Sequence, residues 1–166
     1  MISNDAQKRA LDMMGSNEDG QLGIEHIEQK YSSMDLYLDP VKVMDDVASF
    51  SNHCSSLYTE CAAVKTDGTL WVWGCWGFTD RGTTAESRKP HQIADNVSYA
   101  CCTNYGVAVI RPDHSLWALT DGTGVPNETG YIGNGTHDYF YDTEYKTMDP
   151  CSRANTVEYL YRYIGR

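Results

Sequence analysis

Residues 61–74 read CAAVKTDGTLWVWG, a stretch in which two apolar runs flank the pair Asp67-Gly68. Asp-Gly is a strong signal for a tight two-residue turn between antiparallel strands, so this stretch predicts a β-hairpin. The two strands are apolar at nearly every position rather than at alternate positions. This pattern predicts a sheet that is covered on both of its faces.

The hairpin sequence recurs further along the chain. Residues 64–71 (VKTDGTLW) return 46 positions later as residues 110–117 (IRPDHSLW). A second segment, residues 40–47 (PVKVMDDV), returns 50 positions later as residues 90–97 (PHQIADNV). The difference between these offsets places four extra residues of the first copy within residues 52–60. A repeat of about 50 residues indicates propeller blades or solenoid units, which bury their apolar faces only by stacking.

The repeats predict one repeat domain over residues 1–166 and an all-β fold class, a partial β-propeller of antiparallel blades with about two whole and two partial repeats. The expected units are a partial repeat at 1–39, whole repeats at 40–89 and 90–142, and a partial repeat or closing strand at 143–166. Residues 4–11 have the composition of a short N-terminal helix, whereas the repeat predicts a strand at residues 11–14.

Three motifs together resemble the repeats of the regulator of chromosome condensation family, in the form found in bacterial members. They are residues 67–74 (DGTLWVWG), residues 15–23 (GSNEDGQLG) and residues 40–47, and the resemblance covers most of residues 11–142. The resemblance implies a seven-bladed propeller, and this chain has too few units to close one. We therefore expect an open arc of blades, a fragment of a larger propeller, or a ring completed by other copies.

The chain departs from the family pattern on its inner hairpin strands. The family usually places His-Ser or His-Thr there, whereas this chain has Glu60-Cys61 in the first copy and Gly106-Val107 in the second. Members of the family act as an exchange factor for a small GTPase or as a proteinaceous inhibitor of a bacterial enzyme. The resemblance therefore implies a protein–protein role.

Charge and composition exclude several classes of function. The chain has 13 Lys and Arg against 23 Asp and Glu, a formal net charge of −10, and no basic run. Nucleic-acid affinity depends on clustered cations, so we expect no nucleic-acid partner. No run of 18 apolar residues is present, and the N-terminus lacks the pattern of a signal peptide. We expect no membrane partner and a cytoplasmic location, or secretion if the chain is a fragment of a larger protein.

Candidate chemical groups have simpler structural interpretations. The six cysteines form no C-x-x-C pair, so we expect buried free thiols rather than a zinc site, with a Cys54–Cys61 disulfide as the weaker alternative. His53-Cys54 lacks the surroundings of a nucleophile and its base. Residues 15–26 partly fit an EF-hand calcium loop, but its first and last ligand positions are Gly15 and His26. We therefore predict no catalytic residues, no metal site and no cofactor.

Aromatic residues provide the candidate binding site. Trp71, Trp73 and Trp117 lie in predicted strands and are expected in the core. The remaining candidates lie in predicted connections, where exposed aromatic side chains are typical anchors for a protein partner: Trp76, Phe78, Tyr139, Phe140 and Tyr141. The sequence thus predicts a non-enzymatic binding module that recognises a protein partner with a basic face. The alternative is self-assembly, in which copies complete each other's sheets as a homo-oligomer.

Overall fold

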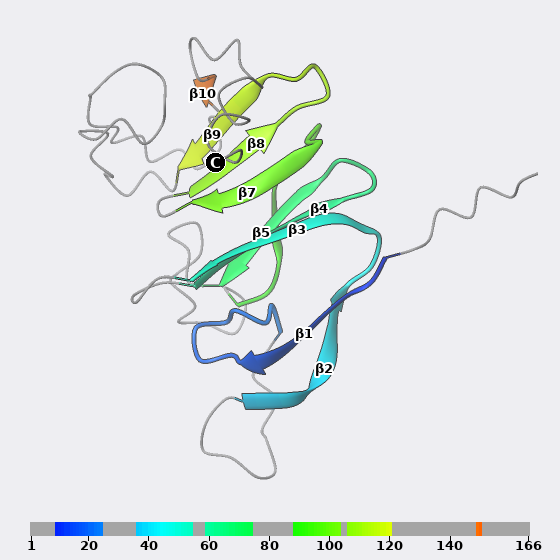
Figure 1. Ribbon diagram of the computed structural model, residues 1–166, viewed down its shortest axis with the longest axis vertical. Helices are drawn as coiled ribbons and strands as arrows, with labels where there is room; N and C mark the ends of the chain where they lie inside the picture. Colours follow the sequence, from blue (N-terminus) through cyan, green and yellow to red (C-terminus); the bar gives the residue numbers. More distant parts are fainter. Residues whose placement is uncertain are drawn as a thin grey trace, which may run out of the picture.

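Three antiparallel sheets stacked one upon another make up the fold (Figure 1). The structure is a computed structural model that describes residues 9–24, 36–54, 59–74, 88–103, 106–120 and 149–150. All regular elements within these ranges are β-strands. This architecture confirms the prediction of an all-β partial propeller. In the part of the chain that the structure describes, no helix has the length and apolar character that a membrane crossing needs.

The first sheet has two strands and each of the others has four. Sheet one pairs β1 (Leu11–Ser16) with β2 (Leu36–Met44). Sheet two runs in the order β3 (Val47–Cys54), β4 (Thr59–Lys65), β5 (Leu70–Gly74) and β6 (His91–Ala94). Sheet three runs in the order β7 (Tyr99–Thr103), β8 (Gly106–Ile110), β9 (Leu116–Thr120) and β10 (Asp149–Pro150).

The hairpins form where the repeated sequence predicts them. In sheet two, the Lys65 N–H donates to the Thr69 carbonyl and the Gly68 N–H donates to the Lys65 carbonyl. The same two bonds join Arg111 to Ser115 and His114 to Arg111 in sheet three. Gly68 has φ +82°, and His114 at the equivalent position has φ 66°. The turn therefore requires a left-handed backbone conformation at this position, and glycine adopts that conformation without strain.

The four extra residues of the first copy lengthen one hairpin. The β3–β4 pairing continues past His53↔Glu60 to Cys54↔Thr59, whereas the equivalent β7–β8 pairing ends at Thr103↔Gly106. The insertion therefore extends this hairpin and leaves the repeated core unchanged.

The sheets are offset from the sequence repeats. β6 comes from residues 90–97, the start of the second repeat, yet it pairs with β5 and so completes sheet two. The Val47 N–H donates to the Arg9 carbonyl, and the Val97 N–H donates to the Gly68 carbonyl. The residues before these valines, Asp46 and Asn96, have φ of 62° and 57°, a conformation that Asp and Asn tolerate better than most residues. The repeated segment thus links each sheet to the next.

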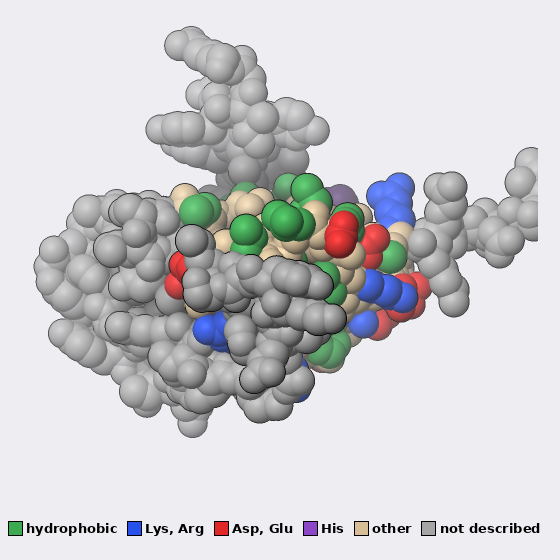
Figure 2. Space-filling model, turned by 90° about the horizontal axis from the view of Figure 1, so that it is seen from below, with side chains coloured by type: hydrophobic (Ala, Val, Ile, Leu, Met, Phe, Trp, Pro, Cys, Tyr) green, Lys and Arg blue, Asp and Glu red, His purple; other side chains and the backbone are tan. Residues whose placement is uncertain are grey.

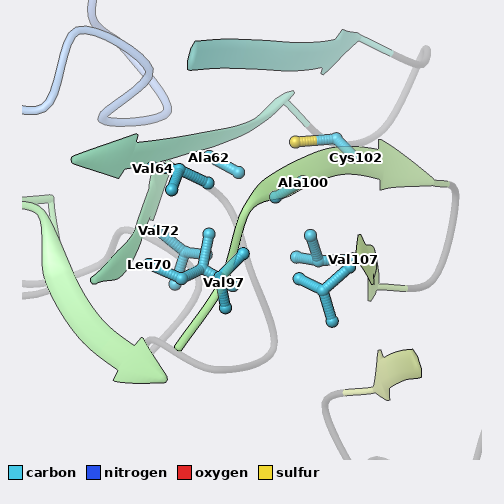
Figure 3. Close-up of a cluster of buried hydrophobic side chains, with 9 residues drawn as sticks. Ala62, Val64, Leu70, Val72, Val97, Ala100, Cys102 and Val107 are labelled. Carbon is cyan, nitrogen blue, oxygen red and sulfur yellow. The ribbon is translucent and has the colours of Figure 1, made fainter. Parts of the chain in front are cut away.

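Sheet two lies between the other two sheets, and apolar clusters fill both gaps. The cluster on the side of sheet one contains Met44, Val47, Cys61, Ala63 and Trp73. The cluster on the side of sheet three contains Ala62, Val64, Leu70, Val72, Val97, Ala100, Cys102, Val107 and Val109 (Figure 3). Successive residues of a strand point to opposite faces, so β4 needs apolar residues on both. This confirms the interpretation of its continuous apolar run.

The sequence predicted the strand at the start of the chain, but it did not predict two other strands, β2 and β6. The start of the chain has a strand at Leu11–Ser16, as the repeat predicts, while the possible helix at residues 4–11 lies largely outside the described residues. The sequence did not predict β2 and β6 as strands. Pro40 and Pro90 lie in or beside these strands, and proline is tolerated in a sheet mainly on an edge strand or at a bulge.

Candidate protein-recognition surface

Three chain connections begin at equivalent positions of the three sheets. β1, β5 and β9 are the corresponding strands of the three sheets: Leu11 pairs with Met44 as Leu70 pairs with Ala94. Gly15 near the end of β1 has φ +115°, and Gly74 at the end of β5 has φ +97°. A backbone with such a φ angle turns away from the strand direction. Glycine adopts this conformation more readily than a residue that has a Cβ atom. The connections that follow these strands therefore start at one rim.

The predicted aromatic site residues follow two of these strands. Trp76 and Phe78 come directly after β5, while Tyr139, Phe140 and Tyr141 belong to the connection after β9. All five lie outside the described residues. The structure therefore locates the points where their segments begin, Gly74 and Thr120, on the same rim of neighbouring sheets.

The connection after β1 is described through Ile24 and shows how such a segment is held. Asn17 is completely buried and is its organising side chain. The Asn17 Oδ1 accepts the Leu22 N–H at 3.0 Å, and the Asn17 Nδ2 donates to the Ile24 carbonyl at 3.3 Å. The Gly20 N–H donates to the Asn17 carbonyl. One buried amide thus fixes a compact loop without regular secondary structure.

The Gln21 carbonyl joins this loop to sheet two. It accepts the Trp73 Nε1–H at 3.0 Å and the Cys61 Sγ–H at 3.3 Å. Cys61 stands where the resemblance predicts serine or threonine, so its thiol supplies the donor that a hydroxyl would supply. A Cβ on Gly23 would lie 2.9 Å from the Trp73 Nε1 atom, so only glycine fits there without displacement.

Arg88 fastens the same loop from a distant part of the sequence. Its guanidinium donates to the Asn17 carbonyl and the Glu18 carbonyl, both at 3.0 Å. A Cβ on Gly20 would lie 2.7 Å from the Arg88 Cγ atom, so the arginine lies directly against the loop backbone. Sequence reasoning missed Arg88, because no local pattern connects it to residues about 70 positions earlier.

The calcium interpretation of residues 15–26 conflicts with this geometry. Asn17, which would be a ligand, already uses its side-chain oxygen for the Leu22 N–H. The loop follows a strand rather than the helix that opens an EF-hand. Among the described residues, no group of three His, Cys, Asp or Glu side chains is arranged to hold a metal ion. The hydrogen bonds of Asn17 and of the Gln21 carbonyl favour the interpretation of residues 15–24 as a connection between repeats.

The opposite rim carries a repeated turn network. The Asp67 carboxylate accepts the Thr69 hydroxyl at 2.7 Å and the Thr69 N–H at 3.0 Å, and the Trp71 Nε1–H donates to the same hydroxyl. Lys65 lies over the Trp71 ring at 5.0 Å from its centroid. These hydrogen bonds hold the pKa of Asp67 below its usual value of 3.8. The network favours a structural role for Trp71.

The equivalent turn of sheet three repeats each contact. Asp113 accepts the Ser115 hydroxyl at 2.6 Å and the Ser115 N–H at 2.9 Å, and Trp117 Nε1–H donates to that hydroxyl at 2.7 Å. Arg111 lies over the Trp117 ring at 4.1 Å. The Ser115 hydrogen bonds hold the pKa of Asp113 below 3.8. Trp117 packs against the core, as predicted for the strand tryptophans.

The described cysteines have free thiols, two buried and two exposed. Burial raises the pKa of Cys61 well above its usual value of 9.0 and raises the pKa of Cys102 to about 12. Both therefore stay protonated and unreactive at neutral pH, as predicted for buried thiols. Cys54 and Cys101 are exposed, contrary to that prediction, because each lies on an edge strand of its sheet, β3 or β7, and follows a less exposed residue. The structure does not contain the alternative Cys54–Cys61 disulfide.

Comparisons with known proteins agree with the architecture. No protein-family model matches the chain, and no curated protein matches it. Among solved structures, Prp20p of Saccharomyces cerevisiae matches this chain with a TM-score of 0.57 and 13% sequence identity. The match covers 89% of this chain and 35% of the Prp20p chain, and that structure was described together with the binding properties of Prp20p towards Gsp1p and histones. Yeast RCC1 (Prp20) with Kap60 bound gives TM-score 0.57 and 14% identity over 89% and 34% of the two chains.

A human protein, WBSCR16, matches at TM-score 0.49 and 19% identity over 72% of this chain. The chain spans about a third of the length of these three solved structures: 34% of WBSCR16, and 35% and 34% of the two Prp20 structures. Together with the three stacked sheets, the Prp20p match shows that the chain has the fold of RCC1-like propeller repeats. The resemblance of the sequence motifs to this type of repeat is confirmed at the level of the fold.

Proposed function

We propose that the chain is a non-enzymatic protein-recognition module whose contact surface is formed by the connections that follow β5 and β9. The observation that carries this proposal is that both strands end at equivalent points of one rim, where Gly74 and Thr120 begin those connections. Stacked sheets hold such points at a fixed spacing, as a rigid scaffold does for binding loops in general. The binding properties of Prp20p support a recognition role for this fold.

The chemistry of these segments favours a protein partner. They carry aromatic residues, whose large side chains contribute most of the energy in many protein interfaces: Trp76, Phe78, Tyr139, Phe140 and Tyr141. The net charge of −10 favours a partner with a basic face, because opposite charge accelerates association.

Alanine substitution tests this site. The double variant Trp76→Ala/Phe78→Ala should weaken binding of a partner captured by the wild-type chain about tenfold or more, while the thermal midpoint stays within about two degrees of wild type. Trp73→Ala is the matched control: Trp73 is completely buried, so this variant should lose about 3–5 kcal/mol of unfolding free energy. Calorimetry and titration of the purified partner measure the two effects. If the double variant unfolds as Trp73→Ala does, these aromatic residues belong to the core and the proposal is wrong.

Self-assembly is a second candidate function, favoured by one specific observation. The face of sheet three that points away from sheet two is apolar at Ala108, Ile110, Leu116 and Ala118. A large apolar sheet face is normally covered by another element or by another protein. Measurement of the molar mass of the purified chain tests this candidate, and a monomer at every concentration would contradict it.

A further inference from the structure

Arg88 joins two neighbouring connections of the stack. The connection that follows β5 begins after Gly74, and Arg88 is the first described residue beyond it. Its Nη1 atom donates to the Asn17 carbonyl and its Nη2 atom donates to the Glu18 carbonyl, each at 3.0 Å. We call this pair of hydrogen bonds the arginine clasp. The clasp fastens the end of the β5 connection to the backbone of the connection that follows β1.

The loop that receives the arginine clasp is itself held by sheet two. Asn17 and Leu22 are at most 2% exposed, and the Leu22 N–H donates to the Asn17 side chain. The Gln21 carbonyl accepts the Nε1–H of Trp73, a residue of β5, at 3.0 Å. The β5 connection starts from the same strand, at Gly74. The clasp therefore returns this connection to a support that is fixed to its own sheet.

The geometry of the clasp suits arginine in particular. Its two acceptors are carbonyl oxygens of successive residues, which a planar guanidinium reaches with two separate N–H groups. A lysine ammonium has the same charge but lacks this planar pair of donors. A Cβ on Gly20 would lie 2.7 Å from the Arg88 Cγ atom and 3.1 Å from its Cα atom. A side chain at position 20 would therefore displace the arginine.

The repeated segment forms its strand without an arginine. Leu38 occupies the equivalent position, 50 residues before Arg88. It is 79% exposed at the end of the stack where Figure 2 shows hydrophobic, acidic and basic side chains together. The strand β2 nevertheless pairs with β1 as β6 pairs with β5. Strand pairing therefore does not depend on the arginine, and its hydrogen bonds act on the connections.

We propose that Arg88 is a positioning residue of the recognition surface. This inference rests on the proposed function, in which the β5 connection presents Trp76 and Phe78 to a protein partner. The start of this connection is fixed at Gly74 and its end is fixed by the arginine clasp. A segment with both ends fixed has fewer conformations to lose when a partner binds. Arg88 therefore raises the affinity for the partner through the connection that it holds.

Hydrogen exchange on the full chain alone tests whether the clasp holds in solution. Arg88→Leu introduces the side chain that the other repeat copy has at this position. The Gly20 N–H donates to the Asn17 carbonyl, and it should exchange about tenfold faster in this variant, because the turn loses the guanidinium that holds its backbone. The amides of β4 should keep their wild-type rates. An unchanged rate at Gly20 would overturn the proposal.

Titration of the purified partner, the same protein as in the Trp76→Ala/Phe78→Ala experiment, measures the effect on recognition. Arg88→Leu should weaken binding about tenfold, mainly through faster dissociation. Its thermal midpoint should stay within about two degrees of wild type. Arg88→Lys keeps the charge but not the planar donors, so it should lose most of the same affinity. Full binding by Arg88→Lys would show that charge alone matters and would refute the positioning role.

Two glycine variants provide an independent test without changing the arginine. Gly20→Ala should weaken binding as Arg88→Leu does, because its Cβ displaces Arg88. Gly68→Ala is the matched control. Gly68 has φ +82° against +74° for Gly20, but it lies on the opposite rim, and a Cβ there would come no closer than 3.5 Å to any neighbouring atom. Gly68→Ala should therefore bind as the wild type, and equal losses in both variants would contradict the proposal.

A double-mutant cycle separates this inference from the proposed function. In the Trp76→Ala/Phe78→Ala background, Arg88→Leu should have no further effect on affinity, because the side chains that it positions are absent. An equal effect in both backgrounds would show that Arg88 acts independently of them and would overturn the positioning role. If the aromatic variant weakens binding and Arg88→Leu does not, the proposed function stands and this inference is wrong. If the aromatic variant binds as the wild type, both are wrong.

Discussion

Gly23 shows how a single residue without a side chain ties a connection to the neighbouring sheet. It has φ +71°, and a Cβ there would lie 3.0 Å from the Val43 Cγ1 atom as well as against Trp73. The close approach allows the neighbouring Gln21 carbonyl to reach the Trp73 Nε1–H. Gly15 also has a left-handed backbone, but a Cβ there would meet nothing within 4 Å.

The two glycines therefore allow the steric effect to be separated from the backbone effect. Gly15→Ala should lower the unfolding free energy by about 1 kcal/mol, which is the cost of a left-handed alanine. Gly23→Ala should lower it by about 2–4 kcal/mol, because the Cβ also displaces Trp73 or Val43. Urea unfolding followed by tryptophan fluorescence measures both. Equal losses in the two variants would show that the contact with Trp73 contributes nothing.

At the scale of the elements, the β4–β5 turn and the β8–β9 turn have the same hydrogen-bond network. In each turn an Asp carboxylate accepts a hydroxyl, and the same hydroxyl accepts a Trp Nε1–H; the hydroxyl belongs to Thr69 in one turn and to Ser115 in the other. Thr69 and Ser115 are interchangeable because both supply a hydroxyl that donates to the preceding Asp. A depressed carboxyl pKa contributes stability above the unfolded-state pKa of about 3.8, and that stability is lost as the pH falls towards the folded-state pKa. The turns are therefore acid-sensitive.

Removal of the hydroxyl groups should reduce this acid sensitivity. The double variant Thr69→Val/Ser115→Ala should raise the pKa of Asp67 and Asp113 towards the usual value. Its unfolding free energy should then fall less steeply between about pH 5 and pH 2 than that of the wild type. Urea unfolding across this pH range measures the slope. Thr69→Ser keeps a hydroxyl and should behave as the wild type; a change of slope in this control would refute the explanation.

Elements also show where sequence reasoning succeeded and where it could not. β4, β5, β8 and β9 were predictable because continuous apolar runs flank a turn signal, and both faces of the strands had to be covered. β2 and β6 carried no comparable signal: Pro40 lies within β2, Pro90 directly precedes β6, and each of the two strands is defined by the strand with which it pairs. The aromatic site could be proposed from the sequence because its five residues lie in predicted connections rather than in predicted strands. The Arg88 contacts could not, because they join segments that only the stacking of sheets brings together.

At the scale of the whole molecule, stability should depend on the position of a sheet in the stack. Sheet two is covered on both faces, whereas sheet three is covered by sheet two on one face. Leu70 and Leu116 occupy equivalent positions in these sheets, and only Leu70 is completely buried. The same substitution at both positions therefore compares an interior sheet with an outer one.

Leu70→Ala should lower the unfolding free energy by about 3–5 kcal/mol, because it leaves a cavity that the surrounding sheets cannot fill. Leu116→Ala should lower it by about 1–2 kcal/mol in the monomer, because this side chain is already partly in contact with water. Denaturation at a protein concentration low enough to keep the chain monomeric measures both values. Equal losses would show that Leu116 is as tightly enclosed as its equivalent.

The offset between sequence repeats and sheets has a consequence for how such a chain can change its length. Each repeat supplies the last strand of one sheet and the first strands of the next, as β6 does for sheet two. Recombination that adds or removes one unit of about 50 residues would therefore join a new closing strand to an equivalent partner. Every sheet within the array would stay complete after such an exchange. The number of blades can thus vary by duplication or loss without a new strand pairing having to arise.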